Sequence, residues 1–273
     1  MMKRADALSR PASDRPDPVR PAESAPVVIL TFSYSGSELL GDFLAGSDSL
    51  SCTALTGLLP MCESVAATWQ QVERREQLSA LAKSSIRALV SSLAMAHSIS
   101  AEARLADAGP PRWCETAISS TSSAGVFLRA FPQARFICFY RRCEDVIAEA
   151  LEGNPWGLGN TEFWAYSAAD PGNNVAAVGA YWVERTRALL DFQLAQPRSC
   201  LSLRREDLEA DAPEQLRLVW SFLGLSPPAA ASWPPGDPAV QRGAQPRFPV
   251  DRLPSRLRTV INELHARLGY PAL

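Results

Sequence analysis

The residues best suited to bind a charged group form a small-residue turn, Ser-Tyr-Ser-Gly-Ser, at positions 33–37. The apolar run at 27–32 before it is rich in β-branched residues and predicts a strand buried on both faces. The amphipathic stretch at 38–46 predicts a helix. A tight turn into a helix N-terminus gathers unpaired backbone N–H groups around an anion, and Gly36 permits close approach. The pattern favours a phosphate or sulfate site, although ordinary strand-turn-helix junctions share it.

The turn is not the phosphate loop of a common nucleotide hydrolase, because the G-x-x-x-x-G-K-[ST] pattern does not occur in the chain. The two lysines, Lys3 and Lys83, do not follow a glycine-rich turn. A nucleotide kinase or other P-loop phosphotransferase is therefore the least favoured alternative.

The composition of the 273 residues indicates a globular protein with an ordinary apolar content of 47%. A net charge of −2 provides no basic field for nucleic acid, and no apolar run reaches the roughly 20 residues of a membrane helix. Residues 1–25 lack a hydrophobic signal region and predict a disordered tail. Six scattered cysteines without a C-x-x-C pair, and only two histidines, predict a cytoplasmic protein with no metal site.

Strand and helix patterns alternate along the rest of the chain. Further strands are predicted at 112–117, 134–140 and 200–203, and helices at 123–130, 144–152, 175–196, 211–224 and 253–268, with two more between 63 and 105. This alternation predicts an α/β fold with a central parallel sheet flanked by helices on both faces. The stretch 154–174, which contains Trp156, Phe163 and Trp164, is predicted to be a functional loop.

Three segments together resemble the PAPS-dependent sulfotransferases, particularly their bacterial small-molecule branch. They are the 33–37 turn, FPQARFICFYRRCEDVIAEAL at 131–151, and SCLSLRREDLEADAPEQLRLVWSFLGLSP at 199–227. The resemblance extends from about Val27 to Tyr270. It implies a P-loop-like sheet in a single domain at 26–273, with PAPS as donor co-substrate. The implied reaction passes a sulfuryl group to a hydroxyl or phenol of a small molecule.

The resemblance also assigns the donor-binding residues. Ser35, Gly36 and Ser37 look like the loop that holds the 5′-phosphosulfate. Arg141, at the end of a predicted strand, looks like the residue that binds the 3′-phosphate. This interpretation requires the Arg141 guanidinium to lie near the serine-lined turn and to be free of a buried pairing with a carboxylate.

Two other arginines, Arg142 and Arg242, are also given expected roles. Arg142 is expected to be the solvated member of the Arg141–Arg142 pair. By resemblance, Arg242 and Gly243 close over the 3′-phosphate, although Arg-Gly dipeptides are common in loops.

Several positions depart from the family pattern. Tyr34 stands where the family usually has Lys or Arg, and so offers a hydrogen bond without a positive charge. Glu38 replaces a frequent Thr or Ser, Glu149 replaces a Ser that contacts the 3′-phosphate, Arg205 replaces a Tyr, and Thr116 replaces a Lys. The changes at Tyr34, Glu38, Thr116 and Glu149 favour the alternative of a catalytically impaired binding protein with the sulfotransferase fold.

The general base that would accept the proton of the acceptor is left open. Asp42 lies one turn beyond the 33–37 turn and shares a helix face with Glu38. His97, near the end of a predicted helix, is an equal candidate, and Glu38 and Glu115 are others. Helices between 61 and 97 and the aromatic stretch are expected to form the acceptor pocket of a monomer or homodimer with no nucleic-acid or membrane partner.

Overall fold

The computed structural model describes residues 25–73, 78–99, 111–118, 121–159, 161–228 and 248–273. The predicted tail lies outside these ranges apart from Ala25. Within the described residues, no helix is both long and apolar enough to cross a membrane.

Five parallel strands form one sheet, in the spatial order β2-β3-β1-β4-β5. They are β1 (Val27–Thr31), β2 (Leu50–Ala54), β3 (Arg112–Ile118), β4 (Arg135–Tyr140) and β5 (Cys200–Arg204). The strand order places β1 at the centre, so the turn that follows it lies between the ends of β3 and β4. Strands β1, β3, β4 and β5 confirm the sequence prediction, whereas β2 was not predicted.

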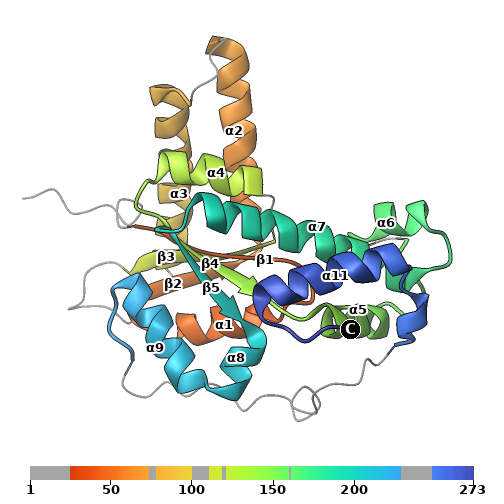
Figure 1. The fold of residues 1–273 in the computed structure, drawn as a ribbon. Helices are drawn as coiled ribbons and strands as arrows, with labels where there is room; N and C mark the ends of the chain where they lie inside the picture. Colours follow the sequence, from red (N-terminus) through yellow and green to blue (C-terminus); the bar gives the residue numbers. More distant parts are fainter. Residues whose placement is uncertain (1–24, 74–77, 100–110, 119–120, 160, 229–247) are drawn as a thin grey trace, which may run out of the picture.

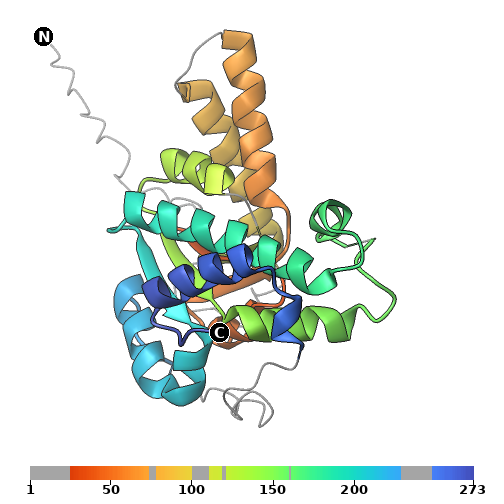
Figure 2. The same cartoon turned by 45° about the vertical axis from the view of Figure 1, so that its right-hand side comes forward.

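Helices cover both faces of the sheet, which confirms the predicted α/β class (Figure 1). The helices are α1 (Ser37–Ala45), α2 (Leu58–Glu73), α3 (Ala80–Ile99), α4 (Thr121–Ala130), α5 (Cys143–Gly153), α6 (Trp164–Ala169), α7 (Asn174–Ala195), α8 (Arg205–Ala210), α9 (Ala212–Leu223) and α11 (Ser255–Leu268). A 3-10 turn lies at Val250–Arg252. Figure 2 shows α2 and α3 projecting together beyond the edge of the sheet.

The two faces are assigned by the alternation of side chains along the strands. Val28 and Leu30 join the larger core, which α2, α3, α4, α5, α7 and α11 cover. Val27 and Ile29 join the smaller core under α1, α8 and α9. Because both faces of the central strand are buried, its sequence is continuously apolar.

The helix ends follow from their capping residues. The Asp211 carboxylate accepts a hydrogen bond of 3.2 Å from the backbone N–H of Glu214 and begins α9, which ends at left-handed Gly224, as the sequence predicts. Asn173 caps α7 in the same way, through the N–H of Ala176.

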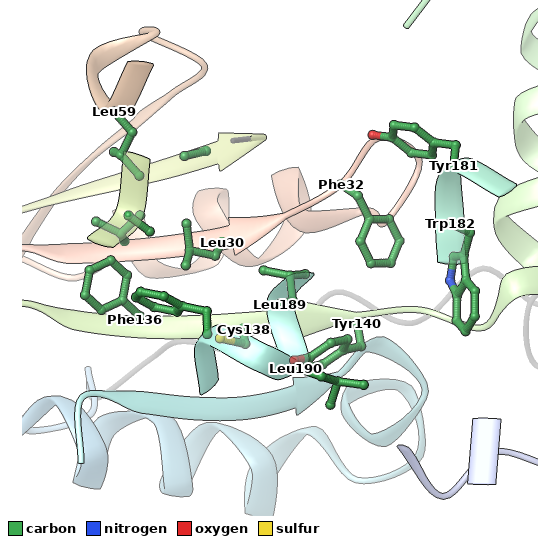
Figure 3. Packing of buried hydrophobic residues seen from close by; sticks show 14 of the residues in the cluster. Leu30, Phe32, Leu59, Phe136, Cys138, Tyr140, Tyr181, Trp182, Leu189 and Leu190 are labelled. Atoms are coloured by element: carbon green, nitrogen blue, oxygen red, sulfur yellow. The ribbon is translucent and has the colours of Figure 1, made fainter. Parts of the chain in front are cut away.

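The larger core reaches the carboxyl ends of β1 and β4, where Phe32 and Tyr140 pack beside α7 (Figure 3). Trp182 of α7 donates a hydrogen bond of 2.9 Å from Nε1 to the backbone carbonyl of Arg141. Because Trp182 is itself buried in the larger core, this hydrogen bond fixes the backbone of Arg141 at the end of β4.

Candidate active site at the carboxyl end of the sheet

The 33–37 loop joins β1 to α1 and contains two left-handed residues, Tyr34 with φ 63° and Gly36 with φ 77°. This region is unfavourable for a residue with a side chain, so Tyr34 must be held there by its surroundings. Gly36 precedes α1 without a side-chain cap. The first-turn N–H groups of Ser37 and Leu39 bond within the loop, and an anion could bind the remaining ones.

Hydrogen bonds fix the loop to the elements around it. The Thr31 hydroxyl donates to Ser35 Oγ at 2.6 Å, and the N–H of Ser37 donates to the same oxygen at 3.3 Å. The N–H of Ser33 donates to the Tyr181 hydroxyl on α7 at 3.1 Å. The loop conformation is therefore set by β1 below it and α7 beside it.

Arg141 lies against this loop, as the sequence interpretation requires. Its Nη1 donates a hydrogen bond of 2.6 Å to the backbone carbonyl of Tyr34. The same nitrogen is bonded to the carboxylate of Glu149, and the Arg141 side chain is 4% exposed. The expectation that Arg141 is free of a buried carboxylate pairing is therefore not met. A 3′-phosphate would have to displace Glu149 to reach this arginine.

A second arginine, Arg205, reaches the loop from the start of α8, directly after β5. A Cβ atom added to Gly36 would lie 2.3 Å from Nη1 of Arg205, so the guanidinium covers the Cα of this glycine. Arg205 Nε donates to Glu209 at 2.8 Å, and its Nη1 lies 4.0 Å from the Glu149 carboxylate. We call these four residues, Arg141, Glu149, Arg205 and Glu209, the charged corner.

The Tyr34 side chain points toward the end of α5. Its hydroxyl accepts a hydrogen bond of 2.8 Å from Asn154 Nδ2, and its ring stacks on Phe163 with centroids 5.8 Å apart. The ring also lies beside Gly153, where a Cβ would come within 3.3 Å. These contacts hold Tyr34 in its left-handed conformation and leave the phenol proton as its one available donor.

The aromatic stretch 154–174 is more structured than the sequence predicts, because it contains α6. Phe163 is buried between Tyr34 and Tyr181 and so packs the loop. Trp156 is 99% exposed and Trp164 is 61% exposed. Among these aromatics, only Phe163 is therefore a core residue.

Glu115 is buried in the middle of β3, beneath the start of α2. Its carboxylate accepts a hydrogen bond from the Thr56 hydroxyl, at 2.6 and 2.7 Å from the two oxygens, and is also bonded by the N–H of Leu58. Burial raises the pKa of Glu115 to about 7, although these hydrogen bonds oppose the shift. The neighbouring Thr116 faces the other side, against Gly41 of α1.

The base candidates on α1 are less enclosed. Glu38 and Asp42 are exposed on α1, which suits the reading of Glu38 as a solvated charge in the first turn of the helix. The backbone of His97 lies in α3, and its side chain is outside the described part of the chain. Arg242 and Gly243 also lie outside the described residues.

The prediction that Arg142 is solvated is wrong. Its side chain is 13% exposed and is paired with Asp145 at 2.8 Å, while its N–H donates to Glu206 at 2.9 Å. Tyr270 donates to the other oxygen of Glu206, at 2.8 Å. Arg142 therefore ties the start of α5 to α8 and to the segment after α11.

The geometry thus combines an uncapped helix start with two guanidinium groups at the end of a parallel sheet, the usual place for ligands in open α/β folds. Residues 26–228 match the family described as "Sulfotransferase family". The chain belongs to the sulfotransferase family. This confirms the resemblance inferred from the three sequence segments. No curated protein sequence is significantly similar to this sulfotransferase.

Solved structures support the fold assignment. A structure titled "Sulfotransferase Domain from the Curacin Biosynthetic Pathway" has a TM-score of 0.58 and 17% identity, and covers 91% of this chain and 99% of its own. A sulfotransferase domain of the Synechococcus PCC 7002 olefin synthase has a TM-score of 0.54 and 19% identity over 90% and 95%. Sulfotransferase STF9 from Mycobacterium avium has a TM-score of 0.51 and 11% identity over 92% and 78%. At these identities, the likeness establishes the fold of the sulfotransferase.

Three residues at the site were not identified from the sequence. Glu209 lies one helical turn after Arg205, a spacing that predicts an ion pair on a helix. Tyr181 lies among the buried, mostly apolar residues of α7. Because a buried tyrosine hydroxyl usually has a hydrogen-bond partner, the sequence could have indicated a contact here. Asn154 gave no signal, because its bond to Tyr34 depends on where α5 ends.

Proposed function

We propose that this sulfotransferase moves a sulfuryl group from PAPS to a hydroxyl or phenol of a small molecule. The observation that carries the proposal is the 33–37 loop, with the guanidinium groups of Arg141 and Arg205 against it. The uncapped start of α1 and its dipole suit a 5′-phosphosulfate. Family membership supports the type of reaction.

In this reaction the acceptor oxygen bonds to sulfur as the bond from sulfur to the bridging oxygen breaks. Adenosine 3′,5′-bisphosphate leaves with the electron pair, and the acceptor proton passes to a base. Asp42, His97 and Glu115 remain the candidates, and the pKa of about 7 for Glu115 suits a general base. With Tyr34 in place of a cation, a nearby guanidinium is the charge available to the leaving oxygen.

The proposal also covers organisation and setting. Residues 26–273 would form the functional domain, with residues 1–25 as a tail, acting as a monomer or homodimer. All six cysteines are free thiols in the described residues, which is consistent with a reducing cytoplasm.

The test is transfer of labelled sulfate from PAPS to a panel of phenols and aliphatic alcohols. Wild-type protein should yield a labelled product and should be stabilised against heat by millimolar adenosine 3′,5′-bisphosphate. Arg141→Ala should lose both effects. Glu263→Gln, on the exposed face of α11, is the control. An intact, folded protein that shows neither transfer nor stabilisation would refute the donor assignment.

A second candidate is a binding protein that has lost catalysis. It is favoured by the phenol at position 34 and by the occupation of Arg141 by Glu149. This candidate predicts no labelled product with any acceptor, and no gain from Tyr34→Lys. Any enzymatic transfer of label from PAPS would exclude it.

A further inference from the structure

We infer that Glu149 is a specificity-determining residue that makes the donor site accept a nucleotide with a free 3′-hydroxyl at least as readily as one with a 3′-phosphate. The inference rests on the proposed function, because it concerns the same donor site. It extends that function to donors of the adenosine 5′-phosphosulfate class.

The first argument is the charge of the corner. Each of its two guanidinium groups already has a carboxylate partner: Arg141 is bonded to Glu149, and Arg205 is bonded to Glu209 at 2.8 Å. Glu149 is also 4.0 Å from Arg205. The four side chains have no net formal charge. A phosphate dianion therefore meets no excess positive charge in this corner, and the nearby carboxylates repel it.

The second argument is the order in which a ligand meets these groups. The side chains of Arg141, Arg205 and Glu209 are 4%, 10% and 9% exposed, whereas that of Glu149 is 48% exposed. An ionised carboxylate only accepts hydrogen bonds. The group that matches it is a hydrogen-bond donor such as a sugar hydroxyl, and carboxylates bind ribose hydroxyls in other nucleotide sites.

The third argument is the contact that Glu149 makes with Arg141. One nitrogen, Nη1 of Arg141, contacts both the carbonyl of Tyr34 in the loop and the carboxylate of Glu149. Glu149 thus lies beside the loop, and it is also 4.0 Å from the Arg205 nitrogen that covers Gly36. The resemblance assigns the 3′ side of the nucleotide to Arg141, so the group at that position would meet the carboxylate of Glu149.

The chemistry is unchanged when the 3′-phosphate is absent. The acceptor oxygen bonds to sulfur, the bond from sulfur to the bridging oxygen breaks, and AMP leaves with the electron pair. The acceptor proton passes to the general base. The 33–37 loop, which faces the reacting group in this arrangement, does not include Glu149.

The experiment is calorimetric titration of the full chain with AMP and with adenosine 3′,5′-bisphosphate. The proteins are wild type, Glu149→Gln, Glu149→Ser and the control Glu263→Gln. Wild type and the control should bind AMP at least as tightly as the bisphosphate. Glu149→Gln and Glu149→Ser should tighten bisphosphate binding about tenfold or more, with AMP binding changed less than about threefold.

Two results would count against this. If wild type binds the bisphosphate about tenfold tighter than AMP, and Glu149→Gln keeps that preference, the inference is overturned and the proposed function stands. If every protein melts normally but binds neither nucleotide, the donor site itself is refuted, and the proposed function fails with the inference.

Discussion

The backbone carbonyl of Tyr34 accepts a hydrogen bond of 2.6 Å from Nη1 of Arg141, a residue 107 positions later in the chain. This bond joins the turn after β1 to the end of β4, the strand beside it. The backbone of Arg141 is fixed as well, because its carbonyl accepts a hydrogen bond of 2.9 Å from Nε1 of Trp182. Arg141 therefore supports the 33–37 loop in addition to any contact with a ligand.

Replacing Arg141 should destabilise the folded chain. Arg141→Met removes the bonds to Tyr34 and to Glu149 from a buried position, and should lower the free energy of unfolding by about 1–3 kcal/mol. Urea unfolding measures the change. The control is Arg217→Met, which breaks an exposed pair with Glu214 and should leave the midpoint nearly unchanged. Equal effects from the two variants would contradict a supporting role for Arg141.

Gly36→Ala should disrupt the loop more than its backbone angle alone explains. The new Cβ would enter the left-handed region, at a cost of about 1–2 kcal/mol, and would also displace the Arg205 guanidinium. Gly172→Ala is the matched control, because Gly172 has φ 85° and nothing within 4 Å of the added atom. Adenosine 3′,5′-bisphosphate binding should weaken about tenfold for Gly36→Ala only. Equal binding by both variants would show that the loop is not the anion site.

The stability of the chain should fall as the pH rises from about 4.5 to about 7. Burial raises the pKa of Glu115 from 4.5 to about 7, so the folded state binds more protons than the unfolded state between these values. A shift of this size corresponds to roughly 3 kcal/mol. Burial raises the pKa of Glu144 to about 7 as well, and the two effects add.

Chemical denaturation at pH 5 and pH 8 would measure this slope in wild type and in Glu115→Gln. The variant should lose the part of the decrease that comes from Glu115, and should keep the parts that come from Glu144 and from Glu206, whose pKa burial also raises. Gln retains a carbonyl oxygen that can accept from Thr56, so the start of α2 should persist. An unchanged slope would mean that Glu115 is ionised throughout this range in the folded protein.

Tyr34→Lys should accelerate sulfuryl transfer if the reaction proposed above takes place. The ammonium would place a charge beside the loop where the phenol offers one hydrogen bond, and a gain of about tenfold or more is expected. Tyr34→Phe is the comparison, since it removes the hydroxyl, with its proton and its bond from Asn154, and adds no charge. Initial rates with labelled PAPS compare the two. If the Tyr34→Lys rate is no higher than that of wild type, a guanidinium already present must stabilise the negative charge that develops on the leaving oxygen.

Strands β1 and β4 could be predicted from sequence because they are almost continuously apolar. β2 could not, since LSCTA lies at the edge of the sheet and mixes polar with apolar residues. The six-residue helices α6 and α8 were also missed, because they are too short to show a helical period.

The 33–37 loop could be predicted because its residues are contiguous and their conformational preferences are local. The pairing of Arg141 with Glu149 was not, because it depends on how β4 turns into α5. Of the adjacent arginines Arg141 and Arg142, sequence reasoning expected one to be solvated. The structure encloses both. Arg141 pairs with Glu149, whereas Arg142 pairs with Asp145 and lies 3.6 Å from Glu206 of α8.

The order of the strands gives the anion site a further property. The loop follows the first strand, whereas Arg141 and Arg205 directly follow the fourth and fifth, so these groups meet only after segments far apart in the chain have paired. Pairing at such separations is slow and comes late in folding. Nucleotide binding would therefore serve as a kinetic probe of the final assembly of the sheet, and a nascent chain that ends before β5 would lack one of its two cations.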